Sequence, residues 1–545
     1  MPEETSQPKP QSQSLQTRRG DLIMPVQDPR KAAASSKRKP AKLAPIKQTG
    51  FFAKVVLVVI VVACFAAMFQ SDVLWSKYDA ATRTSYQTIE TWQPAWQIES
   101  IRSNDPIAAS SYFWEKHIPL APPIAHRGIN LLLHIIAALL LLKCLEALKA
   151  PAAFAATLVF ATHPAVLQPL FWPGYRSEFL GLILILCALL TGIRNNGTTG
   201  TLLTLGFTAL ACLIHPAAMA IPVILTFVIV VQNQRLHLPL FNRVLPLVCI
   251  ALFVGVWTQK SPTPELVSET QETANALNHA AENMFFYIKQ SVMPLTVGLF
   301  HPAEASKSFN VGASISMLPF FLFLPFYVLG ALNFRKPWAR AGLLGITAFL
   351  FLSLNGITQD GVFLSGERAF ENYGLYIALP AIIALLFCGL RQVTRLMRTA
   401  GRLLWLIGFS FFLLIHLAIT ASFANTVGQP TTMWQTMSEQ WKDSWIPKAA
   451  FIESVAETGS DLLTTEGQID LLNAVLNAQP DLIQERTMLA RIYSKAGQNN
   501  NAVREYRRVL RESEPDNAFL EEAAEFYQRV GLDRDARNAR ERKTP

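Results

Sequence analysis

Three side chains capable of acid–base or anion chemistry lie close together in a short polar connector between two apolar runs. His163 precedes Pro164, and Arg176 and Glu178 follow within fifteen residues. Proline and glycine in this stretch interrupt a helix and favour a tight hairpin. A guanidinium is a planar fork suited to phosphate, so Arg176 is a candidate phosphate or sugar contact. The same spacing also allows a purely structural Arg176–Glu178 pair, and the sequence leaves both open.

Apolar runs long enough to cross a bilayer position these groups, because a helical span needs about 20 such residues. The sequence predicts an all-α transmembrane bundle of about eleven spans. We expect them near 52–70, 128–147, 152–170, 178–193, 199–215, 217–232, 243–258, 312–333, 339–356, 373–390 and 403–422. The apolar segment from Asn283 to Phe300 is short and carries Lys289, so we expect it to lie at the interface.

Basic residues occupy alternate gaps between these runs. Lys and Arg beside spans are retained in the cytoplasm, so the gaps with His163, Arg176, His215, His301 and Glu367 are expected to face outward. The N-terminus is then cytoplasmic and the C-terminus extracytoplasmic, most simply in a bacterial inner membrane with a periplasmic C-terminus. Polar side chains gathered on the outer face indicate a protein whose substrate or partner lies on that side of the membrane.

Residues 1–50 form a polar, basic segment with ten Lys or Arg against four Asp or Glu. Such a composition cannot bury enough apolar surface to fold, so we expect a disordered cytoplasmic tail suited to the anionic leaflet. All six cysteines lie in or beside apolar runs, which gives no disulfide framework and no metal motif. The net charge of +9 arises largely from this tail and does not indicate nucleic acid.

Two long outer loops, 70–127 and 258–311, interrupt the predicted membrane domain of residues 51–425. Long loops inside a compact unit are commonly functional. The first contains several tryptophans and carboxylates, of which Asp79, Glu99 and Asp105 are the candidate general bases. At its end, His126, Asn130 and His134 open the second span, where polar groups either hold the bundle together or line a polar site.

The C-terminal region contains an internal repeat. Ala490, Tyr493, Gly497 and Ala502 recur 34 residues later as Ala524, Tyr527, Gly531 and Ala536. This period is typical of tetratricopeptide (TPR) helix pairs. We expect an amphipathic linker at 426–463 and a small TPR α-solenoid at 464–545, with a degenerate first unit between Thr464 and Pro480.

Several landmarks together resemble the GT-C glycosyltransferases that carry C-terminal TPR repeats, whose animal members are protein O-mannosyltransferases. They are Asn130 to His134, the hairpin from His163-Pro164 to Arg176-Ser-Glu178, Tyr287 to His301-Pro302, and Glu371-Asn-Tyr373 to Leu379-Pro380. The resemblance covers most of residues 52–540. It implies that an outer-face acceptor hydroxyl attacks a polyprenyl-phosphate sugar, with a first-loop acid as base and basic residues on the lipid phosphate.

The chain departs from that pattern where chemistry would be expected. It has no adjacent acidic pair soon after the first span, Phe300 stands before His301, and the Glu-Arg-Tyr motif is split between Glu367-Arg368 and Glu371-Asn-Tyr373. The resemblance implies that His163, Arg176, Glu178, His301, Glu367, Arg368 and Glu371 contact substrate. It names no cofactor beyond the lipid-linked sugar, and leaves metal dependence and stereochemistry open.

Two functions from different classes remain. The first is a glycosyltransferase acting on a lipid-linked sugar and a protein acceptor. The second is a non-catalytic membrane scaffold that keeps the GT-C-like architecture and recruits protein partners through its repeats. A carboxylate of the first outer loop placed against Arg176 or Arg368 would favour the enzyme.

Overall fold

The computed structural model describes several stretches of the chain. They are 49–70, 91–96, 106–120, 122–171, 175–194, 197–226, 238–258, 287–294 without 288 and 293, 300–302, 362–363, 367–371 and 373–542. The chain divides into two units, Met1–Ile46 and Lys47–Pro545. Because the described residues begin at Thr49, the predicted basic tail of residues 1–50 lies almost wholly outside them.

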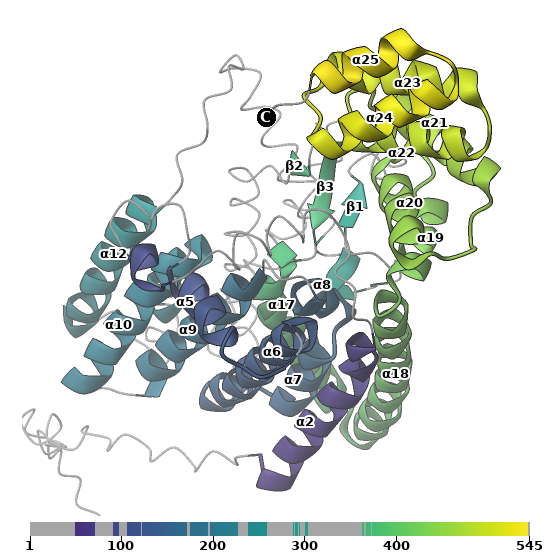
Figure 1. Ribbon diagram of the computed structural model, residues 1–545. Helices are drawn as coiled ribbons and strands as arrows, with labels where there is room; N and C mark the ends of the chain where they lie inside the picture. The colour runs from purple at the N-terminus through teal and green to yellow at the C-terminus, as the bar shows by residue number, and fades with distance from the viewer. Residues whose placement is uncertain are drawn as a thin grey trace, which may run out of the picture. The chain divides into compact units, whose positions relative to one another are not determined.

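Five helices are long and apolar enough to cross a membrane, which is compatible with an integral membrane protein. They are α2 (Phe51–Phe65, continued by the 3-10 turn η1, Ala66–Phe69), α6 (Pro122–Ala147), α9 (Arg176–Arg194), α17 (Tyr373–Leu396) and α18 (Arg398–Val427). Each coincides with a predicted span. The protein is predominantly helical, as the sequence predicts (Figure 1).

A sixth predicted span is broken. Helix α7 (Ala153–Ala161) and the segment Pro164–Phe171, made of η3 (Pro164–Val166) and α8 (Leu167–Phe171), meet at an angle of 48°. Pro164 supplies no backbone N–H, and its ring prevents α7 from continuing. Three more predicted spans carry shorter apolar helices, Thr198–Ile214, Ala217–Thr226 and Val244–Gly255. The first is α10, the second begins in η5 (Pro216–Ala220), and the third lies within α12 (Leu238–Thr258). The predicted spans 312–333 and 339–356 lie outside the described residues.

Hydrogen bonds fix which helix ends lie together. The backbone N–H of Thr49, just before α2, donates to Glu146 at the end of α6 (2.7 Å). At the other end of α2, Met68 accepts from Arg127 near the start of α6 (2.8 Å). Helices α2 and α6 are therefore antiparallel.

Helices α6 and α9 run in the same direction. Arg176 donates to Asn130 near the two helix starts. Cys144, further along α6, contacts the carbonyl of Leu186, which lies further along α9. Helix α17 also starts at this end, where the Tyr376 hydroxyl meets His134 at 2.9 Å.

Helix α18 runs the opposite way. It begins beyond Arg395, and its last turns lie beside the break in the broken span, where the Thr420 hydroxyl donates to the Thr162 carbonyl (2.7 Å). All these helices therefore share one end that carries buried polar side chains. The other end carries exposed or half-exposed basic residues: Lys143, Lys149, Arg194, Arg391, Arg395, Arg398 and Arg402. We call the first the polar end and the second the basic end.

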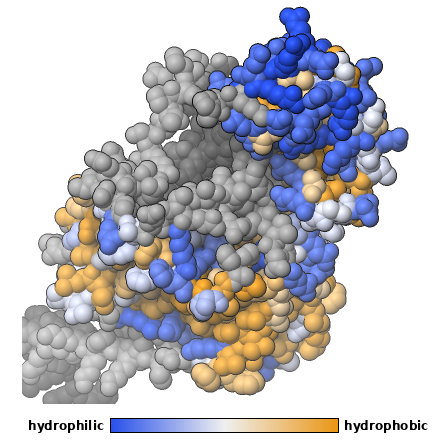
Figure 2. Space-filling model, viewed as in Figure 1, coloured by the Kyte–Doolittle hydropathy of each residue, from blue (hydrophilic) through white to orange (hydrophobic). Residues whose placement is uncertain are grey.

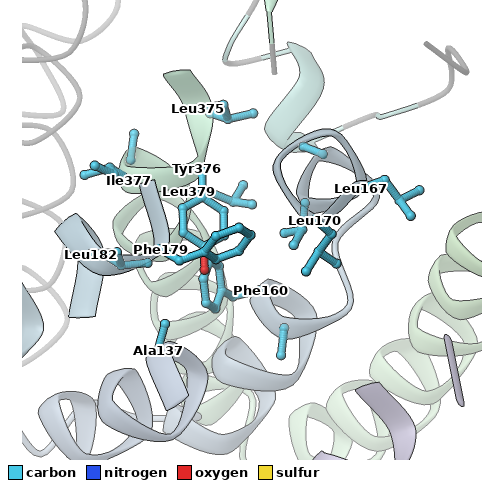
Figure 3. Packing of buried hydrophobic residues seen from close by; sticks show 14 of the residues in the cluster. Ala137, Phe160, Leu167, Leu170, Phe179, Leu182, Leu375, Tyr376, Ile377 and Leu379 are labelled. Atoms are coloured by element: carbon cyan, nitrogen blue, oxygen red, sulfur yellow. The ribbon is translucent and has the colours of Figure 1, made fainter. Parts of the chain in front are cut away.

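An aromatic cluster packs the middle of the bundle. Figure 3 shows Phe160, Phe179 and Tyr376 converging from α7, α9 and α17. The Phe179 and Tyr376 ring centroids lie 4.8 Å apart, edge to face, and all three side chains are fully buried. Between membrane spans such rings stabilise the packing through close van der Waals contact, because lipid is as apolar as the rings themselves. This cluster holds α9 and α17 in register, and so fixes the groups at their starts.

A small antiparallel sheet joins two distant segments. Strands β1 (Phe300–Pro302), β2 (Val362–Phe363) and β3 (Glu367–Glu371) lie in the order β1-β3-β2. The register pairs His301 with Phe370, and Val362 with Arg368. The described residues thus contain one small β-sheet that the all-α prediction did not include.

The segment predicted as a linker at 426–463 contains two packed helices, α19 (Pro430–Gln440) and α20 (Ile446–Thr458). Trp434, Met437 and Phe451 are buried in the same core cluster as the apolar helices. Amphipathic spacing alone does not reveal whether an apolar face has a partner, which is why the sequence suggested a linker here.

The 34-residue repeat corresponds to consecutive helix pairs. Helices α22 (Ile483–Lys495) and α23 (Asn499–Glu512) form one pair, and α24 (Asn517–Arg529) and α25 (Asp533–Glu541) the next. Gly497 and Gly531 turn each pair at φ +72° and +78°, a conformation that glycine adopts without strain. Helix α20 and α21 (Thr465–Ala478) form an earlier pair around Gly459, also at positive φ. Figure 2 shows that these pairs have a hydrophilic surface, in contrast to the apolar helices.

Candidate functional site

Arg176, at the first position of α9, is the centre of a buried polar cluster at the polar end. Its side chain is fully buried. Its Nε donates to Asn130 Oδ1 (3.2 Å) and its Nη1 to Ser111 Oγ (3.3 Å). Its Nη2 forms an ion pair with Glu115 and lies 2.9 Å from His126 Nδ1. Every nitrogen of the guanidinium is therefore engaged.

Helix α5 (Pro106–Glu115), in the first predicted outer loop, supplies half of these partners. Glu115 follows Ser111 by four residues and Tyr112 by three, so it is a neighbour of each on the helix surface. The Arg176 guanidinium stacks 4.1 Å above the Tyr112 ring, a favourable cation–π geometry. One face of α5 thus surrounds the buried cation.

The remaining partners belong to α6. His126 and Asn130 are one helical turn apart, and their side chains approach at 3.2 Å. Asn130 also donates to the carbonyls of Pro169 (3.3 Å) and Leu170 (3.4 Å), which orients its amide. The His126 ring stacks on Tyr112, with centroids 5.8 Å apart. We refer to Ser111, Tyr112, Glu115, His126, Asn130 and Arg176 as the Arg176 cluster.

The charges of this cluster keep Glu115 ionised. Burial acts to raise the pKa of Glu115, but the hydrogen bond from His126 and the charges of Arg176 and His126 outweigh it. The pKa therefore lies below the usual 4.5. At neutral pH the cluster holds a carboxylate beside a permanent cation.

Glu178 lies two residues after Arg176 but belongs to a different contact. Its Oε2 lies 3.4 Å from His215 Nε2, at the end of α10. Residues two apart on a helix do not face each other, so the Arg176–Glu178 pair considered from the sequence is wrong. Arg176 pairs with Glu115 and Glu178 with His215.

Two of the three His-Pro motifs cap helices. His163 Nδ1 accepts the N–H of Ala165 (3.2 Å), and His215 Nδ1 accepts that of Ala217 (3.1 Å). Each Nδ1 is thereby an acceptor, so each Nε2 is the donor in the neutral ring. For His215, Nε2 lies 3.4 Å from Glu178 Oε2, a close contact without hydrogen-bond geometry. For His163 the ring instead bonds the backbone of Ser291 and lies 5.5 Å from the His416 ring.

The remaining predicted site residues are placed only in part. Asp79, Glu99 and Asp105 lie outside the described residues. His301 is on β1, and Glu367, Arg368 and Glu371 are on β3, so the sheet brings together two segments that the sequence predicted on one side. Strand β3 ends two residues before α17, which starts at the polar end.

Glu115 was not singled out from the sequence as a site residue. Glu115 lies 61 residues from Arg176 in the chain, so no local pattern links them. A usable signal was the spacing Ser111-Tyr112-Glu115, which places Glu115 next to two other polar-tipped side chains on a short helix.

The Arg176 cluster combines a carboxylate, an imidazole and a guanidinium. This set can accept a proton from a hydroxyl and hold an anion. Within the stretches that the structure describes, no group of three or more His, Cys, Asp and Glu side chains is placed to hold a metal ion.

In comparisons with known proteins, no protein-family model and no curated protein matches this sequence. Functional conclusions therefore rest on the residues and their geometry.

Proposed function

We propose that this protein is an integral-membrane glycosyltransferase of the GT-C type, which transfers a sugar from a polyprenyl-phosphate donor to a protein acceptor. The observation that carries this proposal is the pairing of Glu115, from the first loop, with the buried Arg176. A carboxylate of the first outer loop beside Arg176 favours an enzyme over a scaffold.

In the proposed reaction the acceptor hydroxyl oxygen forms a bond to the anomeric carbon of the donor sugar. The bond between that carbon and the phosphate oxygen breaks, and the phosphate leaves with the electron pair. The hydroxyl proton passes to a carboxylate, for which we assign Glu115; Asp79, Glu99 and Asp105 remain alternative bases. Arg176 stabilises the negative charge of the departing phosphate.

The two unlike ends of the bundle support an orientation. If the basic end is cytoplasmic, the Arg176 cluster faces the extracytoplasmic side, as does the C-terminal region that follows α18. In a cysteine-free background we expect Ala518→Cys to react with an impermeant thiol reagent in intact cells. Lys143→Cys, exposed at the basic end, is the matched control and should react only after the cytoplasm is opened.

The helix pairs from α20 to α25 are assigned as TPR units that bind the acceptor or another protein. This assignment rests on the 34-residue repeat of buried small residues and glycine turns. Within this proposal the membrane domain has about eleven spans.

The test is transfer of labelled sugar from a panel of polyprenyl-phosphate sugars, using membranes that contain each variant. Removing a positioned general base costs roughly a hundred- to ten-thousandfold in rate, so Glu115→Gln should abolish transfer. Glu146→Gln is the matched control, because Glu146 is a buried carboxylate at the opposite end of α6. Loss in Asp79→Asn, Glu99→Gln or Asp105→Asn, with Glu115→Gln active, would move the base to that residue.

A non-catalytic scaffold is the second candidate, and one observation favours it. Every nitrogen of Arg176 already has a partner within the protein, as expected of a purely structural arginine. Absence of transfer from every donor in the panel, together with partner capture through the repeats, would establish the scaffold.

A further inference from the structure

The partners of Arg176 fall into two groups that differ in how they are anchored. Asn130 and His126 lie on α6, a long apolar helix that packs along α9 and α7. Ser111, Tyr112 and Glu115 lie on α5, which has ten residues and packs against α9 and α10. The first group belongs to a long apolar helix, whereas the second belongs to one short helix and would have to move as a unit.

Departure of α5 would uncover a specific part of the guanidinium. The Nε–H would stay with Asn130, and Nη2 would stay beside His126. Nη1 would lose Ser111, and Nη2 would lose Glu115. The face of the guanidinium that stacks on the ring would lose Tyr112. Two adjacent N–H groups on one edge match two oxygens of a phosphate as well as those of a carboxylate.

We propose that Glu115 occupies the phosphate site of the donor, and that the lipid phosphate displaces it from Arg176. This inference rests on the proposed function and adds its regulation: the carboxylate is held by the cation until donor binds, and is then released beside the anomeric carbon. Donor phosphate and Glu115 are competitors for one guanidinium. Binding of the donor and release of the base are the same event.

Charge balance favours such an exchange. Arg176 is fully buried, so removing its anion without replacement would leave an uncompensated buried cation, which is strongly unfavourable. A phosphate supplies at least the charge that Glu115 withdraws. The released Glu115 loses the contacts that hold its pKa low, and its basicity rises just when a proton must be accepted.

Competition predicts an effect of opposite sign to that of an ordinary binding residue. Glu115→Gln removes the internal competitor, so the purified full chain in detergent should bind polyprenyl monophosphate about tenfold more tightly, given the strength of a charge-assisted hydrogen bond. Ser111→Ala loses one neutral hydrogen bond of α5, and should bind about threefold more tightly. Glu146→Gln should bind as the wild type does.

Hydrogen exchange on the wild type provides a second readout. Saturating polyprenyl monophosphate should increase exchange in residues 106–115 and leave α6 and α9 protected. Free inorganic phosphate at equal concentration distinguishes the source of the anion: an equal effect would show a site for phosphate alone and overturn the lipid assignment.

The failure of this inference differs from failure of the proposed function. Wild-type transfer combined with unchanged exchange in α5, or with weaker lipid binding by both Glu115→Gln and Ser111→Ala, would overturn the competition and leave the enzyme. A wild type that neither binds polyprenyl monophosphate nor transfers sugar overturns both.

Discussion

Two buried arginine–glutamate pairs in this protein have similar geometry and different surroundings. In the helical repeats, Arg486 Nη1 lies 2.9 Å from Glu505 Oε2, with side chains 3% and 6% exposed. At the polar end, Arg176 pairs with Glu115, with side chains 0% and 14% exposed. Burial and pairing alone do not distinguish them.

The repeat itself shows what the first pair does. Thirty-four residues after Arg486 and Glu505 stand Leu520 and Ala539, which are 2% and 1% exposed. The same positions in consecutive helix pairs thus accept either an ion pair or two apolar side chains. Apolar replacement of a buried ion pair is often neutral or stabilising, so the Arg486–Glu505 pair is a packing solution with an alternative inside the same chain.

The Arg176 cluster has no such alternative on the described part of the chain. Its arginine contacts five side chains from two helices, and one of those helices belongs to a connecting loop. Polar groups within a membrane protein are costly and mark function more often than stability. The comparison therefore separates a charge pair that has an apolar alternative in the same chain from one to which the proposed function assigns chemistry.

The largest expected difference between the pairs is in transfer activity. In the proposed reaction Arg176→Gln removes the cation that stabilises the departing phosphate, and such stabilising groups contribute on the order of a hundred- to a thousandfold. Arg176→Lys keeps the charge without the fork and should retain part of the rate. The double variant Arg486→Leu/Glu505→Ala, which copies the second repeat, should transfer within about threefold of wild type. Equal losses in both regions would refute the distinction.

The second difference concerns stability within the repeats. Arg486→Leu alone leaves the buried Glu505 carboxylate with only the exposed Arg504 as an ion-pair partner, and should destabilise the helix pair by about 1–3 kcal/mol. The double variant Arg486→Leu/Glu505→Ala should recover to within about 1 kcal/mol of wild type. Hydrogen exchange of α22 and α23 in the full chain measures both. A double variant as unstable as the single one would show that the two repeats are not interchangeable at these positions.

The sequence predicted these two regions unequally, for a physical reason. The repeat was found because its signal is local: the positions of Ala490, Tyr493 and Gly497 recur at a fixed displacement, and each helix pair turns at its own glycine. The five long apolar helices were found because hydrophobicity over one helix length is also a local property.

The Arg176 cluster was only half predicted. Arg176 was a candidate, and the sequence left two partners open: its chain neighbour Glu178, or a carboxylate of the first outer loop. Helical periodicity turns Arg176 and Glu178 apart, and tertiary packing brings Glu115 from 61 residues away. The break in the span at His163 was likewise visible as His-Pro, although its role as a cap that accepts the Ala165 N–H emerges only from the structure.

The pH dependence of stability should reveal the Glu115 contact. The folded-state pKa of Glu115 is below its usual value of 4.5. Its stabilising contribution is therefore complete above the unfolded pKa and is lost as the pH falls through the folded pKa. The difference in Tm between wild type and Glu115→Gln should be constant near neutral pH and shrink below about pH 4.5. A difference independent of pH would mean that the carboxylate charge does not stabilise the cluster.

The smallest effect is expected at a third arginine–glutamate pair, which shows how far exposure weakens such contacts. Arg491 Nη2 donates to Glu522 Oε2 at 2.7 Å, and its Nε bonds the same carboxylate at 2.9 Å and 3.0 Å. The side chains are 48% and 34% exposed, and exposed pairs contribute about 0–1 kcal/mol even with good geometry. Arg491→Ala should therefore change the free energy of opening of α22 and α24 by less than about 1 kcal/mol, and less still in high salt.

Glu522→Ala should cost more than Arg491→Ala, because Glu522 also accepts from the buried Tyr506 hydroxyl (2.8 Å), which would lose this acceptor. Hydrogen exchange at low and high ionic strength provides the measurement. If Arg491→Ala destabilised the helices as much as Arg486→Leu, burial would not be what distinguishes the pairs of this molecule.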